Sequence, residues 1–228
     1  MKAIVLADGD APDRDRLDAV WPGWSDEVGL VVAADGGARH AAALGLHLDL
    51  WVGDGDSIGA AALADLAASG IEIRRLEAAK DESDTEIAIT ATLERGATEM
   101  LILGAFGGAR LDHALANVGL LAMPELADRR VALLDGSTRV TLIRAPGPDG
   151  EAVHRPLPGR IGDLVSLLPH GPGVEGVVTH GLAYPLRDEP LPVGPARGLS
   201  NVRTEPDAGV AVRRGLLLVI ETPATLVP

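Results

Sequence analysis

Two aspartates separated by one glycine directly follow an apolar run, and this segment of the sequence is the one best suited to chemistry. Residues 48–52 lead through Gly53 into Asp54, Gly55 and Asp56. A strand that ends in this way holds two carboxylates at the edge of a sheet with little bulk between them, which suits a hard cation such as Mg²⁺. The same residues could instead form an ordinary hydrogen-bonded turn, because Asp and Gly are common in turns.

Three further polar segments follow apolar runs in the first half of the chain. They are Asp35-Gly36-Gly37, the run from Lys80 to Glu86, and the loop from Gly104 to His113. The first of them precedes an expected helix, and a helix N-terminus is a natural seat for a phosphate group. An ordinary strand-to-helix turn is the alternative interpretation of that segment.

The second polar segment is unusual in its density of charge. Asp81 and Asp84 are three residues apart, so both would face one side of a helical turn and repel each other unless a cation or an ammonium group lies between them. Lys80 could supply that ammonium group or bind a phosphate. Alternatively, the segment is a solvated helix start, since acidic residues suit the positive end of the helix dipole.

The third polar segment joins glycines to Arg110 and to the pair Asp112-His113. Glycines permit close approach of the backbone to a phosphate, and an arginine can bind one through two hydrogen bonds. For His113 alone, a structural place at a helix start is the simpler interpretation. The sequence contains neither a Gly-x-x-x-x-Gly-Lys-Ser/Thr loop nor a legible Ser/His/Asp triad. Carboxylates, glycine turns and isolated cations together favour metal-assisted phosphoryl or pyrophosphoryl transfer.

These segments need a scaffold that brings them together, and the apolar pattern predicts one. Strands are expected at 3–7, 30–34, 48–52, 71–76, 100–103 and 131–134, alternating with helices at 13–20, 38–44, 60–68 and 84–95 and with a last helix that follows His113 and runs to Leu121. Ser57 is the expected N-cap of the third helix, and Ser83 or Asp84 that of the fourth. Near-continuous apolar strands that alternate with helices indicate a parallel sheet covered on both faces, which binds ligands at the carboxyl ends of its strands. All four polar segments fall at such ends.

The character of the sequence changes after about residue 135. Proline and glycine become frequent, and short strands are expected at 139–143, 163–168, 174–179 and 216–221. We therefore expect an α/β fold in two domains. Residues 1–135 would form a Rossmann-like, mostly parallel sheet flanked by helices, and residues 136–228 a C-terminal all-β sandwich.

Composition excludes several classes of protein. The 228 residues carry a formal net charge of −13, which argues against a general nucleic-acid binder, and they include no cysteine, so zinc-thiolate sites and thiol nucleophiles are excluded. No basic segment with an apolar core precedes the first strand, and no apolar run approaches the length of a membrane span. We expect a cytoplasmic protein without a membrane partner.

Taken together and in order, the motifs resemble those of the thiamine pyrophosphokinase family. They are Ala34-Asp-Gly-Gly-Ala38, Gly53-Asp-Gly-Asp-Ser-Ile58, Lys80-Asp-Glu-Ser-Asp-Thr-Glu86, Gly107-Gly-Ala-Arg-Leu-Asp-His113, Gly181-Leu-Ala-Tyr-Pro-Leu186 and Gly198-Leu-Ser-Asn201. Each motif alone is weak, but six in sequence are specific, and they span nearly the whole chain.

This resemblance implies Mg²⁺-dependent transfer of pyrophosphate from ATP to the hydroxyl of thiamine, giving thiamine diphosphate and AMP, by a homodimer with sites at its interface. The implied metal ligands are Asp35, Asp54, Asp56 and Asp84. The residues implied for catalysis are Asp54, Asp56, Asp81 and Asp84. Those implied for the nucleotide and its phosphates are Gly36, Gly37, Lys80, Thr85, Arg110, Asp112 and His113. Tyr184, Ser200 and Asn201 would lie near thiamine, where the ring of the only tyrosine suits a cationic thiazolium. A place in a strand's core is the alternative for Tyr184.

Three positions depart from the family pattern. Gly55 stands in place of the usual Phe, Ala79 in place of an Asp, and Val202 in place of a Glu. Two other functions remain open at this point. A Mg²⁺-dependent phosphatase or nucleotidyltransferase would use the same carboxylates but leave Tyr184 unexplained. A non-catalytic thiamine or nucleotide sensor would keep the scaffold without turnover.

Overall fold

The computed structural model describes residues 1–77 and 79–226. The chain divides into two compact units, Met1–Gly136 and Ser137–Pro228. The first unit contains both strands and helices, and the second is built from strands and one short 3₁₀ turn among the residues described. The prediction of a mixed α/β protein is confirmed.

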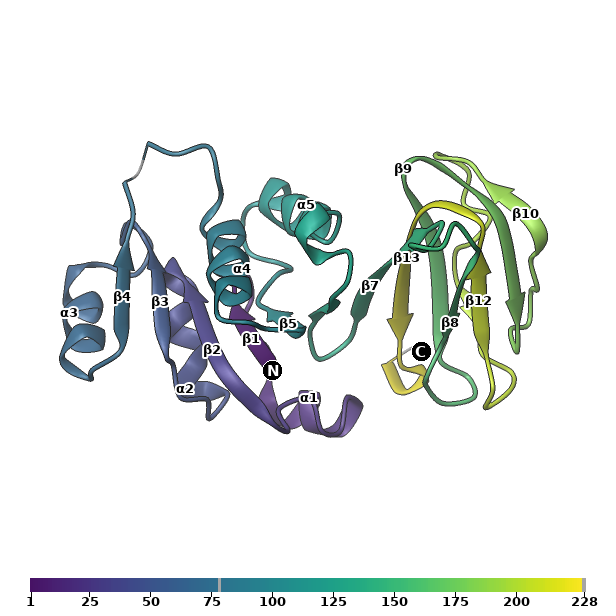
Figure 1. The fold of residues 1–228 in the computed structure, drawn as a ribbon. Coiled ribbons are helices and arrows are strands. Elements are labelled where there is room, and N and C mark those ends of the chain that lie inside the picture. Colours follow the sequence, from purple (N-terminus) through teal and green to yellow (C-terminus); the bar gives the residue numbers. More distant parts are fainter. Residues whose placement is uncertain (78, 227–228) are drawn as a thin grey trace. The chain divides into compact units, whose positions relative to one another are not determined.

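The strands of the first unit form one parallel sheet (Figure 1). They are β1 (Lys2–Leu6), β2 (Val28–Ala34), β3 (Leu50–Gly53), β4 (Glu72–Arg75), β5 (Glu99–Leu103) and β6 (Arg130–Leu134). Their order is β4-β3-β2-β1-β5-β6, and each neighbouring pair is parallel. All six were predicted within a few residues; β1, β2, β3, β5 and β6 are mostly apolar, whereas β4 carries three charged residues and only Ile73 is apolar. A parallel arrangement places the carboxyl ends of these strands along one edge.

The helical elements of the first unit connect these strands. They are α1 (Arg14–Val20), η1 (a 3₁₀ helix, Asp35–Arg39), α2 (His40–Ala43), α3 (Ala60–Ala68), α4 (Asp84–Glu94), α5 (Leu111–Leu120) and η2 (Pro124–Leu126). Figure 1 shows helices on both faces of the sheet, and α4 packs on β1, β2 and β3. The predicted cap of α4 is confirmed, because Ser83 Oγ accepts a hydrogen bond from the Glu86 amide at 3.2 Å.

Two local predictions are wrong. Ser57 does not cap α3, which begins after Gly59 without a side-chain cap, because Ser57 instead hydrogen bonds to neighbouring aspartates. The single helix expected at 38–44 is a 3₁₀ turn followed by one short α-helical turn. The chain tightens there because Asp35 itself enters the turn, at φ +40.

The second unit is organised around one long strand, β9 (Leu164–His180). The other strands are β7 (Arg139–Ala145), β8 (Val153–Pro156), β10 (Arg187–Leu191), β11 (Asn201–Val202), β12 (Gly209–Val212) and β13 (Arg214–Thr222), and η3 (Ala224–Leu226) follows. The first half of β9 pairs antiparallel with β13 and β11, and its second half with β12 and β10. The two strands predicted at 163–168 and 174–179 are therefore one, and β8, β10, β11 and β12 were not predicted.

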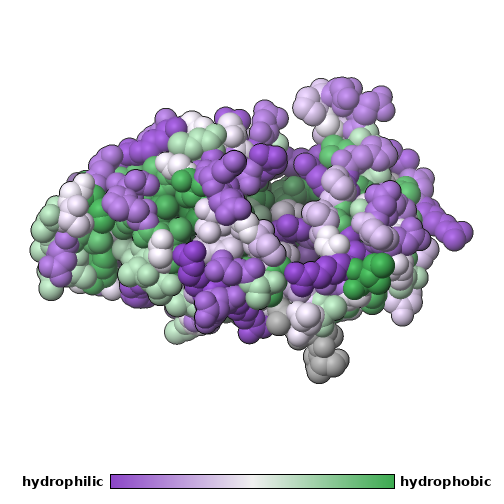
Figure 2. Space-filling model, turned by 90° about the horizontal axis from the view of Figure 1, so that it is seen from below, coloured by the Kyte–Doolittle hydropathy of each residue, from purple (hydrophilic) through white to green (hydrophobic). Residues whose placement is uncertain are grey.

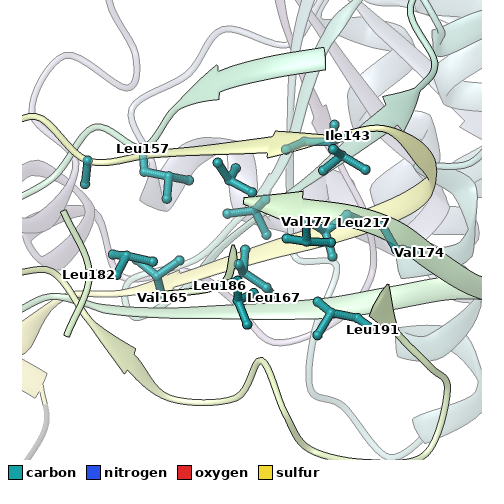
Figure 3. Packing of buried hydrophobic residues seen from close by; sticks show 14 residues of the cluster. Ile143, Leu157, Val165, Leu167, Val174, Val177, Leu182, Leu186, Leu191 and Leu217 are labelled. Carbon is teal, nitrogen blue, oxygen red and sulfur yellow. The ribbon is translucent and has the colours of Figure 1, made fainter. Parts of the chain in front are cut away.

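An aliphatic core fills the second unit. Figure 3 shows Val165, Leu167, Val177 and Leu217 from β9 and β13 packed with Leu186, which precedes β10. Leu, Val and Ile supply this core because the chain has few aromatic residues. A separate apolar cluster fills the first unit, with Trp51 among its fully buried side chains.

Buried charges cross the second unit beside this core. Glu221 on β13 is 6% exposed and accepts two hydrogen bonds from Arg139, at 2.7 and 2.9 Å. Arg203 is 1% exposed, and its Nη2 lies 3.7 Å from Glu221 Oε1. Burial lowers the pKa of Arg203, and the nearby Glu221 opposes this shift. Glu221 is thus the counter-ion of two arginines inside the unit.

Among the described residues, no helix is both long enough and apolar enough to cross a membrane. On the face of the molecule seen from below, hydrophilic and hydrophobic residues are interspersed (Figure 2). The cytoplasmic location stays a prediction.

Candidate functional site

Three of the predicted metal ligands meet at the carboxyl ends of β2 and β3. Asp35 follows β2, while Asp54 and Asp56 follow β3. One carboxylate oxygen from each lies within 4.8 Å of the others. The sheet brings them together because β2 and β3 are adjacent and parallel, with Ala34 opposite Val52.

Asp35 is the buried member of this cluster, at 2% exposed. Its Oδ2 accepts a hydrogen bond from the Ser57 amide at 3.1 Å, and its backbone carbonyl accepts one from Trp51 Nε1 at 3.0 Å. Its Oδ1 is buried without any hydrogen-bond partner in the structure. Burial raises the pKa of Asp35. A buried carboxylate oxygen without a hydrogen-bond partner destabilises the folded protein unless a ligand interacts with it. A bound cation would supply that interaction.

Asp54 and Asp56 form the more accessible side of the cluster. The Asp56 amide donates to Asp54 Oδ1 at 3.0 Å, and Ser57 Oγ donates to Asp56 Oδ1 at 3.0 Å. The hydrogen bond from Ser57 and the neighbouring Asp35 carboxyl hold the pKa of Asp56 below its usual value. One carboxylate is thus kept charged and exposed beside a buried one, which is a donor set that fits Mg²⁺.

Lys80 links this cluster to α4. Its Nζ donates to Asp84 Oδ1 at 2.7 Å and lies 4.0 Å from Asp54 Oδ2. The ammonium group that the sequence called for beside Asp84 is therefore Lys80. Asp84 is near enough to Asp35 to help raise the pKa of that residue. Asp81 is exposed, and it is not one of the three residues whose ligand atoms meet. Thr85 is 8% exposed in the first turn of α4.

Gly36 and Gly37, predicted as phosphate-binding residues, pack closely against β1 and the loop after it. A Cβ on Gly37 would lie 2.2 Å from the Leu6 carbonyl oxygen, and one on Gly36 would lie 2.4 Å from Asp8 Oδ1. The two glycines thus allow η1 to approach β1, which brings Asp35 into the cluster. This close packing explains both residues without a ligand, and their binding of phosphate stays a prediction.

Replacing Gly37 by Ala is expected to lower the stability of the protein by about 1–3 kcal/mol, the usual cost of overpacking. The added methyl group meets backbone, which cannot move aside as a flexible side chain can. Gly119→Ala is the matched control, since a Cβ at that position in α5 meets no atom within 4 Å. The control should be neutral or gain up to about 1 kcal/mol. Chemical denaturation of the two variants measures both values, and equal stabilities would contradict the packing argument.

The loop from Gly104 to His113 carries the predicted phosphate cations at the surface. Arg110 Nε and Nη2 donate to Asp112 Oδ1 and Oδ2 at 2.9 and 2.5 Å. This pairing lowers the pKa of Asp112 to about 2. His113 is exposed at the start of α5. The guanidinium of Arg110 is thus already bound to a carboxylate within its own loop.

The loop after β1 contains polar residues that were not predicted to belong to the site. Asp8 forms an ion pair with Arg39. Asp10 Oδ1 accepts a hydrogen bond from the Gly108 amide at 2.8 Å, and His40 Nε2 lies 3.2 Å from the Gly9 carbonyl oxygen. Burial lowers the pKa of His40. The signal was present, because Asp8-Gly9-Asp10 repeats the Asp-Gly-Asp pattern of 54–56 after a strand.

The residues expected near thiamine lie together in the second unit. Asn201 is buried, and its side chain hydrogen bonds to both backbone polar groups of Tyr184. The side chain of Tyr184 is exposed, since the residue is 63% exposed, so the alternative of a core tyrosine is wrong. Ser200 is exposed at φ +54, and its amide donates to Ser166 Oγ at 3.0 Å.

Comparison with known proteins matches both units to one family. Residues 23–133 match the profile described as thiamin pyrophosphokinase, catalytic domain, and residues 152–217 match that described as thiamin pyrophosphokinase, vitamin B1 binding domain. The thiamine pyrophosphokinase of Bacillus subtilis (strain 168) is 24% identical over 201 residues, which are 88% of this chain and 90% of that protein.

Solved structures of the family have the same fold. The Bacillus subtilis thiamine pyrophosphokinase aligns with a TM-score of 0.81 at 22% identity, covering 98% of this chain and 99% of that one. The family protein from Enterococcus faecalis gives a TM-score of 0.77 at 26% identity, with coverage of 97% and 99%. The yeast enzyme gives 0.75 at 15% identity, with coverage of 99% and 87%. The two profiles together span most of the chain, and with these relatives they show that it belongs to the thiamine pyrophosphokinase family, as the motifs predicted.

Proposed function

We propose that this chain is a Mg²⁺-dependent enzyme that transfers pyrophosphate from ATP to thiamine. The observation that carries the proposal is the cluster of Asp35, Asp54 and Asp56 at the carboxyl edge of the sheet, with one buried oxygen left without a partner. Membership of the family supports the thiamine diphosphokinase activity. The carboxylate cluster supports the proposal that the reaction depends on Mg²⁺. The first unit would be the Rossmann-like catalytic domain, 1–135, and the second the thiamine-binding β-sandwich, 136–228.

The reaction forms one bond and breaks one. The primary hydroxyl oxygen of thiamine attacks the β-phosphorus of ATP, the bond from that phosphorus to the oxygen bridging it to the α-phosphate breaks, and AMP leaves. Mg²⁺, when bound, would neutralise charge on the transferred phosphates and hold them in line. Asp35, Asp54 and Asp56 would hold it, with Asp84 beside them.

The chain's own cations and acids would complete the catalytic site. Lys80 Nζ lies 4.0 Å from Asp54 Oδ2 and 2.7 Å from Asp84 Oδ1, and this ammonium group would bind a phosphate of the nucleotide. Thr85 and Arg110 would meet phosphates, with Gly36, Gly37, Asp112 and His113 in the nucleotide environment. Asp81 and Asp84 are the two carboxylates that could act as the general base and accept the proton of the thiamine hydroxyl. Asp81 is exposed and Asp84 is bound to Lys80, so Asp81 is the freer of the two.

Tyr184, Ser200 and Asn201 would lie near thiamine. An exposed aromatic ring suits a cationic thiazolium. We propose that the enzyme is a homodimer in which the second unit of one subunit completes the site of the other. Resemblance to the family supports this arrangement, and sedimentation of the purified protein at several concentrations would test it.

Incubation of the purified protein with thiamine, ATP and Mg²⁺ tests the proposed reaction. Thiamine diphosphate and AMP should appear in equal amounts, and a chelator should stop the formation of both. Excess Mg²⁺ added after the chelator should restore the activity.

Other product patterns would contradict the proposal in distinct ways. ADP or free phosphate in place of AMP would indicate another kinase or a phosphatase, and pyrophosphate release would indicate a nucleotidyltransferase. Binding of thiamine without any product would indicate a sensor.

A further inference from the structure

The side chain of Asn201 is committed to holding one residue. Its Oδ1 accepts a hydrogen bond from the Tyr184 amide at 2.9 Å, and its Nδ2 donates to the Tyr184 carbonyl at 2.7 Å. The same Oδ1 accepts from the Val202 amide at 3.0 Å. An asparagine side chain offers two donor hydrogens and two acceptor lone pairs, so three of its four capacities are used inside the chain.

The burial of the two residues separates their roles. Asn201 is 5% exposed, whereas Tyr184 is 63% exposed. A buried amide that bonds both backbone groups of a neighbour fixes that neighbour's backbone in place, much as a strand partner would. What it fixes here is the position from which an exposed aromatic ring reaches solvent.

The surrounding backbone strengthens this connection between two turns. The Ala183 amide donates to the Val202 carbonyl at 2.8 Å, and Leu182 forms an isolated antiparallel bridge with Arg203. The segment carrying Tyr184 and the segment carrying Asn201 are therefore bonded to each other directly. The bonds of Asn201 continue this short ladder beyond the last bridge to the aromatic residue itself.

We propose that Asn201 is a positioning residue, which holds the ring of Tyr184 ready for the thiazolium of thiamine rather than contacting thiamine itself. This inference rests on the proposed function for its ligand, while its structural part concerns the free protein. It predicts that loss of the side-chain amide of Asn201 weakens the binding of thiamine only by displacing Tyr184.

The first test uses the only tyrosine of the chain as a probe. Ring-labelled tyrosine gives the signals of a single residue in the NMR spectrum of the full-length protein. Asn201→Ala should shift or broaden them in the absence of any ligand. Thr179→Val is the matched control, since Thr179 Oγ1 accepts a buried hydrogen bond from the Leu186 amide at 2.8 Å, two residues beyond Tyr184. The control should leave the signals in place, and unchanged signals in Asn201→Ala would overturn the proposal.

The second test measures additivity in thiamine kinetics. Asn201→Ala should raise KM for thiamine by about tenfold, the effect expected for loss of satisfied buried hydrogen bonds, with kcat changed much less. In a Tyr184→Ala background the same substitution should change KM by less than about twofold, since coupled residues are not additive. Full additivity would show a direct contact with thiamine and overturn the proposal.

Two further measurements keep the tests decisive. If Asn201→Ala does not fold, Asn201→Asp retains the acceptors and places a carboxylate against the Tyr184 carbonyl, and it should move the tyrosine signals in the same way. If the unsubstituted protein makes no thiamine diphosphate, thiamine titrated against the tyrosine signals decides the ligand. A saturable shift would support thiamine as the ligand beside Tyr184 although the proposed reaction had failed, and no shift would overturn the thiamine part of the inference.

Discussion

Replacement of Asp56 by Asn is expected to lower turnover by about a thousandfold or more, which corresponds to ~4 kcal/mol of transition-state stabilisation. The substitution keeps the shape of the side chain and removes one charge from the three-carboxylate cluster. Because Asp56 is exposed, the fold should remain intact. Turnover at saturating thiamine and ATP, measured beside the circular dichroism spectrum, checks both statements.

A matched substitution separates the metal from general charge effects. Asp65→Asn removes the same charge from the exposed surface of α3 and should leave turnover within about twofold, since an isolated surface charge contributes little. Added Mg²⁺ should raise the melting temperature of the unsubstituted protein and of the Asp65 variant, but much less that of Asp56→Asn. Full turnover in Asp56→Asn would exclude this residue from the metal site.

Replacement of Glu221 by Gln is expected to lower the free energy of unfolding by about 3–5 kcal/mol, the usual cost of removing one partner from a buried ionic group. Glu221 accepts two hydrogen bonds from Arg139 and forms an ion pair with Arg203, and both of these partners lie in the second unit. Without its charge, the two guanidinium groups would repel each other in a buried environment. Urea denaturation measures the change.

The control for this substitution is an ion pair at the surface that also includes a residue of β13. Glu175 on β9 lies 3.9 Å from Arg214 on β13, and the two side chains are more than half exposed. Glu175→Gln should change stability by less than about 1 kcal/mol. A similar loss in both variants would show that burial does not decide the effect.

The parallel sheet and its polar edge could be predicted because each depends on short segments. A run such as residues 100–103 is apolar at every position and can be recognised without its neighbours. The grouping of Asp35 with Asp54 and Asp56 then follows from a general rule for parallel sheets. The short ladder that joins Asn201 to Tyr184 has no such rule, because it depends on two turns seventeen residues apart in the sequence meeting in space.

The strands of the second unit were harder to predict from the sequence, because glycines that are typical of turns lie inside a strand. Gly171 and Gly173 flank Pro172, a pattern typical of a turn between two strands. In the structure both glycines lie within β9, at φ +90 and +131, and let one strand bend and change its pairing partners. The short strands β8 and β10 contain proline and several charged residues, so their apolar pattern is weak. Pairing with β9 and β12, not local propensity, makes them strands.

The continuity of β9 has a consequence for how the chain is made. The first unit is complete at Gly136, so it can fold while the ribosome is still synthesising the rest. β9 follows after β7 and β8 but stays incompletely paired, because its longest partner, β13, is the last strand described. Until residues 214–222 emerge, β9 and β7 present unpaired edges, which are templates for association with other chains. During synthesis there is thus a stage in which all residues of the first unit are present while the second unit still lacks the strand that completes its pairing.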